Sequence, residues 1–251
     1  FVALDAGVRF MKYMGSKNRI VNEIIPIMLE HRKSNQWFVD LFCGGCHIIQ
    51  NVDGKRIAND KNKYLIAMWK GLQENKDRPY IISKELYSRA RTEYNNNTNI
   101  EFDDFMIGWI GWMGSYNGRF FDGGYSSHNA GKTGRNYIGE QIRNTESQVA
   151  YLTNVKFFSK DYSEFEFKEY CLIYCDIPYK DTTQYVTSKD FDYDKFFDWC
   201  RNMSKDGHTI FVSEYQAPKD FKCIWQKEVT NSMNQIKTYK PIEKLFILNR
   251  E

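Results

Sequence analysis

The pattern of apolar and polar positions along the chain alternates between short continuous apolar runs and stretches of helical spacing. Apolar runs are typical of strands buried on both faces, and apolar residues spaced three or four apart predict helices. Strands alternating with helices indicate crossover units and a parallel, doubly wound α/β sheet. Strands are predicted at 36–42, 55–60, 155–159, 171–176, 208–213, 223–229 and 244–249, and helices at 17–31, 61–72 and 193–203, with a further helix start at 47–52.

The alternation breaks in the middle of the chain. Residues 75–150 contain two helical stretches, 83–94 and 101–113, followed by a span rich in glycine. We interpret this region as an insert into a single α/β domain. That domain comprises residues 11–74 and 151–251.

Composition limits the class of protein. The chain has 251 residues, 42% of them hydrophobic, so it can bury a large core. It has no apolar run of eighteen residues, and we expect no membrane span. Its formal net charge of +3 permits a polyanionic partner without arguing for one. Six cysteines and no export signal favour a reducing cytoplasm. Residues 1–10 are interpreted as a leader or tag scar.

A glycine turn follows the first predicted strand. The run FVDLFCGG ends in Gly44 and Gly45, and glycines at such a corner let a nucleotide-like ligand approach the backbone. Asp60 ends the next strand, about 20 residues beyond Asp40, where a ribose-binding acid lies in dinucleotide folds. The phosphate-binding spacings are missing, which favours a neutral or positively charged nucleoside. An ordinary strand–turn–helix corner remains the alternative.

The run YCDIPY carries the candidate chemistry. Asp176 follows an apolar strand, and the carboxyl end of a strand faces the ligand crevice in such a sheet. Pro178 restrains Ile177 to extended geometry and so fixes its carbonyl. The Asp176 carboxylate and this carbonyl can accept the two hydrogens of one amino group, and Tyr179 offers a surface for a stacked base. The alternative is a structural acid–proline turn.

Together, five blocks in order resemble the Dam-like DNA adenine (N6) methyltransferase family, especially its phage and prophage members. The blocks are YMGSK at 13–17, FVDLFCGG at 38–45, IANDKN at 57–62, SKDY at 159–162 and YCDIPY at 174–179. The resemblance implies a Rossmann-like methyltransferase sheet with a helical and hairpin target-recognition insert. It also implies S-adenosylmethionine (SAM) as cofactor and double-stranded DNA as partner.

The same resemblance implies roles for individual residues. Asp176, Ile177, Pro178 and Tyr179 match the catalytic block, which acts on an adenine flipped out of the duplex. The residues expected at the cofactor are Tyr13, Lys17, Phe42, Cys43, Gly44, Gly45, Asp60, Asp161, Tyr162 and Asp176. Two positions depart from the family: Ile177 replaces a proline, and Cys46 replaces a glycine where a side chain is expected to crowd the cofactor.

For DNA contact, the insert supplies the candidates. SYNGRFF resembles the family segment that touches target DNA, and residues 119–143 carry a small positive excess with interleaved aromatics. Tyr116, Asn117, Arg119 and Arg135 are the expected contacts. Residues 213–215 are weaker candidates for the target pocket.

Two other functions stay open alongside DNA adenine methylation. One is methylation of RNA adenine or protein glutamine, although such relatives usually carry Asn at the position of Asp176 and lack the insert. The other is a catalytically weakened relative that still binds DNA. A metal or redox site at Cys43, Cys46 and His47 is not expected, because no second cysteine pair has matching spacing.

Overall fold

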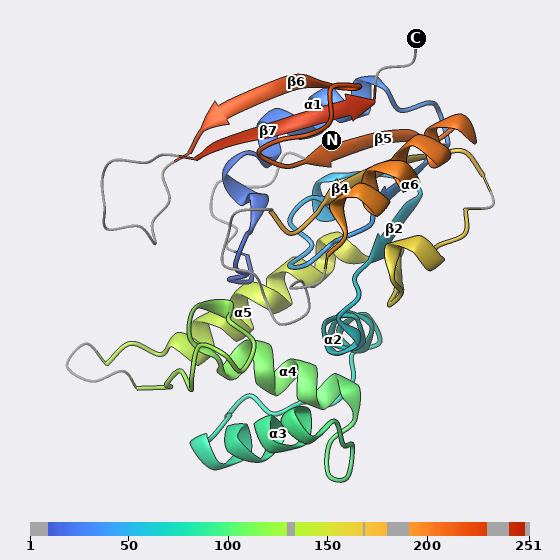
Figure 1. Cartoon of the computed structure of the whole chain (residues 1–251). Coiled ribbons are helices and arrows are strands. Elements are labelled where there is room, and N and C mark those ends of the chain that lie inside the picture. Colours follow the sequence, from blue (N-terminus) through green and yellow to red (C-terminus); the bar gives the residue numbers. More distant parts are fainter. Residues whose placement is uncertain (1–9, 130–133, 168, 180–190, 230–240, 249–251) are drawn as a thin grey trace.

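The computed structural model describes residues 10–129, 134–167, 169–179, 191–229 and 241–248. Its centre is a seven-stranded sheet in the order β3-β2-β1-β4-β5-β7-β6 (Figure 1). The first five strands pair in parallel, and β7 runs antiparallel to both of its neighbours. The expected leader lies outside the described residues except for its last position.

The strands match the predicted apolar runs to within a few residues. Val39 and Ile173, paired across β1 and β4, are fully buried, as the apolar runs predict for strands covered on both faces. The strands are β1 (Trp37–Asp40), β2 (Arg56–Asn59), β3 (Val155–Phe158), β4 (Cys171–Asp176), β5 (Thr209–Ser213), β6 (Phe221–Glu228) and β7 (Ile242–Leu248).

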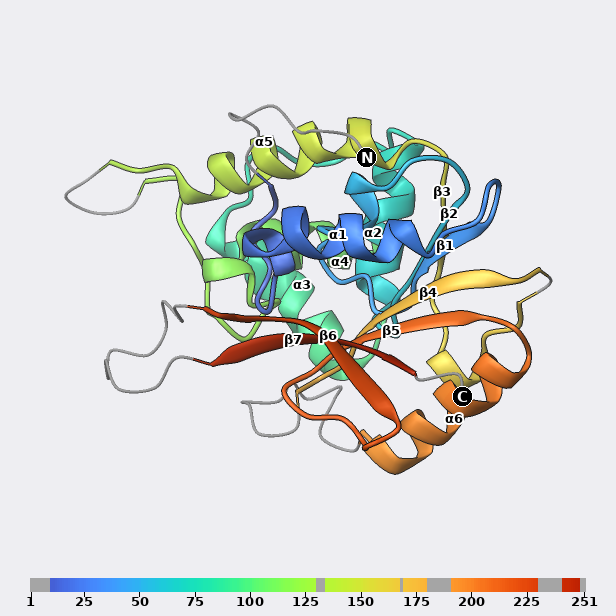
Figure 2. The ribbon, with the colours of Figure 1, turned by 90° about the horizontal axis from the view of Figure 1, so that it is seen from above.

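Helices cover both faces of the sheet (Figure 2). α1 (Val21–Glu30) and α2 (Lys63–Gln73) share one apolar cluster with alternate strand residues, and α6 (Tyr193–Lys205) shares the other. Asn62 caps α2, since its side chain accepts from the backbone N–H groups of Tyr64 and Leu65. Successive side chains of each strand therefore point to opposite faces of the sheet and pack into two separate cores.

The predicted insert contains three helices, α3 (Lys84–Asn96), α4 (Asp104–Gly114) and α5 (Tyr137–Val149). α3 and α4 lie beyond α2, away from the sheet (Figure 1), and α4 packs directly on α2. Gly108 permits this contact, because a Cβ there would come within 2.2 Å of the Tyr64 carbonyl oxygen. The predicted domain boundaries at 75 and 150 stay a prediction.

Two expectations about elements differ from the structure. Residues 47–52 do not start an α-helix; they form only the 3₁₀ turn η2 (Ile49–Asn51). In contrast, α5 was not predicted, because its glycine and many polar side chains hide an apolar stripe that includes Ile138 and Ile142. Within the described ranges, none of the helices is long and apolar enough to cross a membrane.

Candidate active site

The carboxyl ends of β1 and β4 form the centre of the site. The strand order reverses between these two strands, and ligands of doubly wound sheets bind at such a switch point. Asp40 pairs in register with Tyr174, which places Asp176 two residues further along the same edge. Asp40 is close enough to Asp176 and Asp60 that their charges help to raise its pKa. The sequence-predicted acids therefore meet in one place.

The glycine turn binds the acid that ends β2. The Gly44 N–H donates to Asp60 Oδ2 at 3.1 Å, and the Asn62 N–H donates to Asp60 Oδ1 at 2.9 Å. Gly44 has φ +46°, and a Cβ there would lie 2.7 Å from the Tyr13 ring. Glycine is therefore required by conformation and by the close approach of Tyr13. Cys43 is buried beneath this turn.

Cys46 occupies a backbone conformation that favours glycine, with φ +60°. Its side chain is fully buried in the apolar cluster of α1 and α2, and its thiol lies 3.9 Å from the Gly44 carbonyl oxygen. The thiol thus packs in the core, and its cost to the turn is backbone strain of about 1–2 kcal/mol.

α5 braces this turn from the side of the insert. Gln148 is fully buried; its Nε2 donates to the Gly45 carbonyl at 2.6 Å, and its Oε1 accepts from the Met11 N–H at 3.1 Å. Two turns earlier on the helix, Gln141 makes the same two kinds of hydrogen bond with the backbone of Lys12. Its Oε1 accepts from the Lys12 N–H at 2.9 Å, and its Nε2 donates to the Lys12 carbonyl at 3.1 Å. The amino-terminal segment is thereby fixed between α5 and the glycine turn.

Asp176 lies in an ion-pair network rather than alone. Lys17 Nζ is 2.9 Å from Asp176 Oδ1 and 3.7 Å from Glu243 Oε2, and the Lys17 side chain is only 8% exposed. Burial raises the pKa of Asp176 to about 6, although Lys17 opposes that shift. The pKa of Lys17 is raised because these carboxylates outweigh its own burial. Lys17 was predicted at the cofactor, and here it contacts Asp176, the acid predicted to be catalytic.

Tyr179 stands beside this network. Its ring lies 4.4 Å from Lys17 Nζ and 4.5 Å from the Tyr215 ring, which it meets edge to face. Its hydroxyl donates to Glu243 Oε2 at 2.5 Å. Pro178 is tied to α6, because the Tyr193 hydroxyl donates to its carbonyl at 2.8 Å. Ile177 is buried in the α6 cluster, so the apolar replacement for proline has a place in the core.

An aromatic group lies next to the ends of β1 and β3. The ring of Phe42 is 5.8 Å from Tyr162, and Phe191 contacts both rings at 6.1 and 5.8 Å. Asp161 caps the short turn that starts at Tyr162 and pairs with Lys61 at 3.0 Å. This arrangement places aromatic rings beside a carboxylate, a combination that suits a purine base and its sugar.

The acids of the crevice favour a cationic guest. Burial raises the pKa of Asp40 well above its ordinary value, and burial also raises the pKa of Asp60. Asp40 Oδ1 is buried and has no hydrogen-bond partner among the described residues. A buried orphan acceptor is costly, and an incoming N–H group would satisfy it. The carboxylates of Asp40 and Asp60 therefore suit a nucleoside that carries an amino group and a positive charge.

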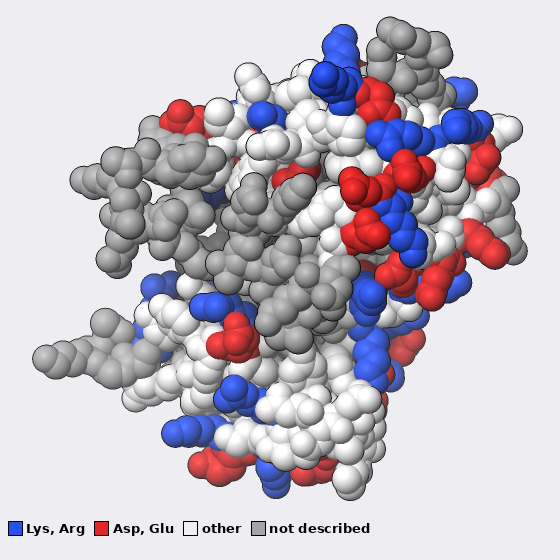
Figure 3. All heavy atoms as spheres, in the orientation of Figure 1, with Lys and Arg blue, Asp and Glu red and all other residues white. Residues whose placement is uncertain are grey.

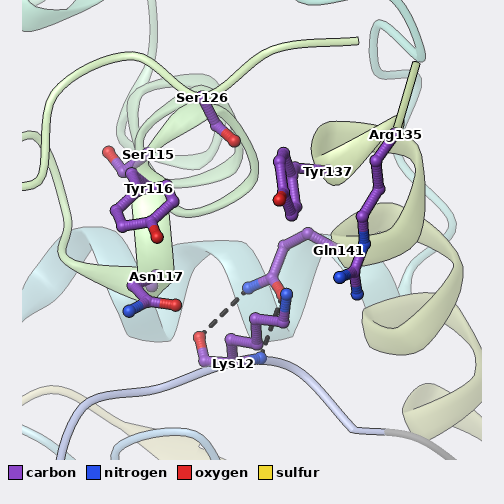
Figure 4. Close-up of a pocket in the computed structure, with 9 residues that line it drawn as sticks. Lys12, Ser115, Tyr116, Asn117, Ser126, Arg135, Tyr137 and Gln141 are labelled. Carbon is purple, nitrogen blue, oxygen red and sulfur yellow. Dashed lines mark hydrogen bonds between the residues drawn. The ribbon is translucent and has the colours of Figure 1, made fainter. Parts of the chain in front are cut away.

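A second, polar pocket of about 210 Å³ lies between the amino-terminal segment and the insert (Figure 4). It brings together three of the four predicted DNA contacts, Tyr116, Asn117 and Arg135. Arg119 lies outside the lining and pairs with Asp122 at 3.2 Å. The complete lining is Lys12, Ser115, Tyr116, Asn117, Gly118, Ser126, Arg135, Tyr137 and Gln141.

The charge of this pocket is partly compensated. Arg135 makes two hydrogen bonds with Glu140, at 2.7 and 2.9 Å, and Lys12 Nζ lies 3.7 Å from the same carboxylate. Both cations lie over the Tyr137 ring, at 4.9 and 5.6 Å. Elsewhere on the face shown in Figure 3, basic and acidic side chains are interspersed among the described residues.

The weaker candidates at the end of β5 divide into two groups. Tyr215 packs on Tyr179, whereas Ser213 is buried and its hydroxyl pairs with that of Tyr174 at 2.8 Å. Glu214 is buried and accepts from the Tyr215 N–H at 2.6 Å. No group of three metal-binding side chains occurs in the part of the chain that is described, and Cys43 and Cys46 are free thiols.

Several residues of the site were not predicted from the sequence. Glu243 lies in a strand whose position next to β5 depends on long-range pairing, so its proximity to Tyr179 carries no local signal. Gln141 and Gln148 lie seven residues apart, a two-turn spacing that would have placed them on one face of a predicted helix. Lys12 directly precedes the block YMGSK at 13–17 but was not among the predicted DNA contacts.

Known proteins resemble this chain in sequence. The chain is 27% identical over 197 residues to Modification methylase StsI of Streptococcus sanguinis, and 26% identical over 193 residues to Type II methyltransferase M.FokI of Planomicrobium okeanokoites. Each match covers 69% of this chain and 29% of the relative, so the chain spans less than a third of either.

One solved structure, SMU.472, assigned as a methyltransferase and crystallised with SAH, aligns at a TM-score of 0.42 and 14% identity. That alignment covers 94% of this chain and 53% of the other. The model of the D12 class N6 adenine-specific DNA methyltransferases matches residues 13–241, which is most of the sequence. The predicted resemblance is confirmed at this level, and the narrower phage-type expectation stays a prediction. The chain belongs to the D12 class N6 adenine-specific DNA methyltransferase family.

Proposed function

We propose that the chain transfers a methyl group from SAM to the exocyclic amine of an adenine flipped out of duplex DNA. The observation that carries the proposal is the position of Asp176 and Tyr179 at the switch point, beside the glycine turn. Membership of the D12 family supports this activity and its substrate. The end of β4 joins a hydrogen-bond acceptor and an aromatic ring where a methyl donor and an extruded base would meet.

Two features of this chain's residues would bind the base. The Asp176 carboxylate accepts a hydrogen bond from one N–H of the adenine amine, and the restrained Ile177 carbonyl accepts a hydrogen bond from the second N–H. Two acceptors favour a nitrogen lone pair that is localised and able to attack. Tyr179 stacks on the ring and helps to repay the few kcal/mol that unstacking costs. Catalysis then depends on positioning and on fixed dipoles rather than on a strong base.

The residues that would hold SAM fit its chemistry. SAM supplies an electrophilic methyl group on a positively charged sulfur. Asp60 provides a carboxylate for the ribose hydroxyls, and Phe42 and Tyr162 provide the aromatic surface for the adenine ring. The orphan Oδ1 of Asp40 suits the ammonium of the methionine part. The negative crevice favours the cationic donor over its neutral product.

The polar pocket of Figure 4 is the proposed DNA-reading surface. Lys12 and Arg135 would neutralise phosphates or donate to base edges, which requires competition with Glu140. Tyr116 is half exposed at the rim, where its ring can stack on a base. Gln141 links this surface to the amino-terminal segment through two backbone hydrogen bonds.

The test is methyl transfer to duplex DNA by the wild-type chain and by Asp176→Ala, with tritiated SAM and identification of the methylated base. N6-methyladenine from the wild type and a loss of at least a thousandfold in the variant are expected. SAM binding by the variant, measured by calorimetry, should survive. Full activity of Asp176→Ala, or methylation of RNA or glutamine peptides in place of DNA, would refute the proposal.

A further inference from the structure

The carboxylate of Glu243 lies in the candidate active site, and the proposed methyl transfer assigns it no role. Glu243 comes from β7, the antiparallel strand between β5 and β6, and lies far in the sequence from the catalytic block. Its Oε2 accepts a hydrogen bond from the Tyr179 hydroxyl at 2.5 Å, and the Lys17 ammonium lies 3.7 Å from the same oxygen. Its side chain is 15% exposed, so both interactions are shielded from water.

We infer that Glu243 is a positioning residue for the target base: it fixes the Tyr179 ring, on which the base would stack, and it pairs with the Lys17 ammonium that lies over this ring. This inference rests on the proposed function. A buried phenol and a buried ammonium both need partners, and one carboxylate on a rigid strand serves both. The hydrogen bond fixes the ring plane of Tyr179, on which stacking geometry depends.

The contacts of Lys17 explain why a second carboxylate is needed. Its ammonium lies against Asp176 at 2.9 Å and over the Tyr179 ring at 4.4 Å, which are the two groups proposed to bind the adenine. When the base enters, the ammonium must yield part of these contacts. Glu243 lies within ion-pair distance and can keep the charge paired, so that Asp176 is free to accept from the amine.

Neighbouring residues sharpen the assignment. Tyr215 packs edge to face against Tyr179, with ring centroids 4.5 Å apart, which restricts the Tyr179 ring further once its hydroxyl is bound. Glu228, on the adjacent strand β6, is an exposed acid of the same hairpin and lies opposite Ile242. Because it is exposed and lies on the other strand of the hairpin, it provides a control for the loss of one carboxylate from this hairpin.

The experiment compares Glu243→Ala, Glu243→Gln and Glu228→Ala in the full chain. Glu243→Ala should lower kcat for methylation of duplex DNA by about 10- to 100-fold, the range for a lost hydrogen bond to a charged group. The kcat of Glu243→Gln should lie between those of Glu243→Ala and the wild type, because the amide oxygen of glutamine still accepts from the Tyr179 hydroxyl. The fluorescence of 2-aminopurine at the target position should show weaker stacking in the same order. The Kd for SAM should stay within about twofold, and Glu228→Ala should match the wild type.

A double-mutant cycle with Tyr179→Phe separates positioning from general damage. If Glu243 acts through the Tyr179 hydroxyl, its removal costs at least fivefold less in the Tyr179→Phe background than in the wild type. Multiplicative effects, an unchanged kcat in Glu243→Ala, or SAM binding lost together with activity in both Glu243 variants would overturn the inference. Failure of the proposed function itself would appear differently, as a wild-type chain that does not methylate DNA.

Discussion

Replacing Lys17 by methionine tests the electrostatics of the site. In the wild type, burial raises the pKa of Asp176 to about 6, and the ammonium 2.9 Å away is the largest factor that keeps it from rising further. A protonated Asp176 loses acceptor capacity for the adenine amine. Activity should therefore fall as the pH drops through about 6, which is the sign expected for a raised carboxyl pKa.

The size of the effect follows from the distance. Unit charges 2.9 Å apart at an effective dielectric constant of about 20 interact by at most about 6 kcal/mol. Opposite charges at such range typically lower a carboxyl pKa by about 1–3 units, because desolvation offsets much of the attraction. Without Lys17, the pKa of Asp176 should rise to between about 7 and 9. At pH 7 the ionised fraction then falls by about twofold to 100-fold.

The assay is kcat/KM for a duplex substrate at saturating SAM, measured from pH 5 to 10. Lys17→Met should shift the acid limb upward by about 1–3 units and recover much of its activity at high pH. Lys17→Arg should keep the acid limb near pH 6. Lys55→Met removes a lysine from an exposed pair with Glu169 at 3.4 Å and serves as the control. A pH-independent loss in Lys17→Met, with the acid limb unmoved, would refute this account of Asp176.

Three further predictions concern the cofactor turn, the brace and the DNA surface. Gly44→Ala places a Cβ 2.7 Å from Tyr13 at φ +46° and should weaken SAM binding by about tenfold in calorimetry; unchanged binding would contradict the steric reasoning. Gln148→Ala leaves two buried backbone groups without their partner and should lower the free energy of unfolding by about 2–5 kcal/mol in urea titrations; a loss below about 0.5 kcal/mol would contradict it. Arg135→Gln should reduce the slope of log Kd against log salt for DNA by about 0.9, whereas Arg201→Gln, on α6, should leave it unchanged.

Local pattern was sufficient to predict the sheet and the ends of its strands. The apolar runs predicted as strands at 36–42 and 171–176 form β1 and β4, which lie side by side in parallel. Asp60 was predicted only as an acid for the ribose, and in the structure it also accepts from the Gly44 N–H. These relations depend on strand order and on the chain direction, which the alternation of elements already constrains.

What could not be predicted depends on contacts between distant segments. Lys17 was assigned to the cofactor by its block, yet its partner is decided by how η1 (Lys17–Arg19) packs against β4 and β7. Glu243 reaches Tyr179 only because β7 inserts between β5 and β6. Arg119 shares a segment with Asn117, but it pairs with Asp122 and lies outside the pocket lining.

The charges at the carboxyl edge explain how one site can hold several acids before its ligand arrives. Burial raises the pKa of both Asp40 and Asp60, the charges of Asp176 and Asp60 raise that of Asp40 further, and Lys17 opposes the rise at Asp176. A bound sulfonium would bring a further positive charge into the same crevice. It would favour the ionised form of each acid, so we expect SAM binding to release protons and to strengthen as the pH rises. We therefore expect these carboxylates to serve both cofactor affinity and base recognition, with Lys17 holding Asp176 in its ionised form.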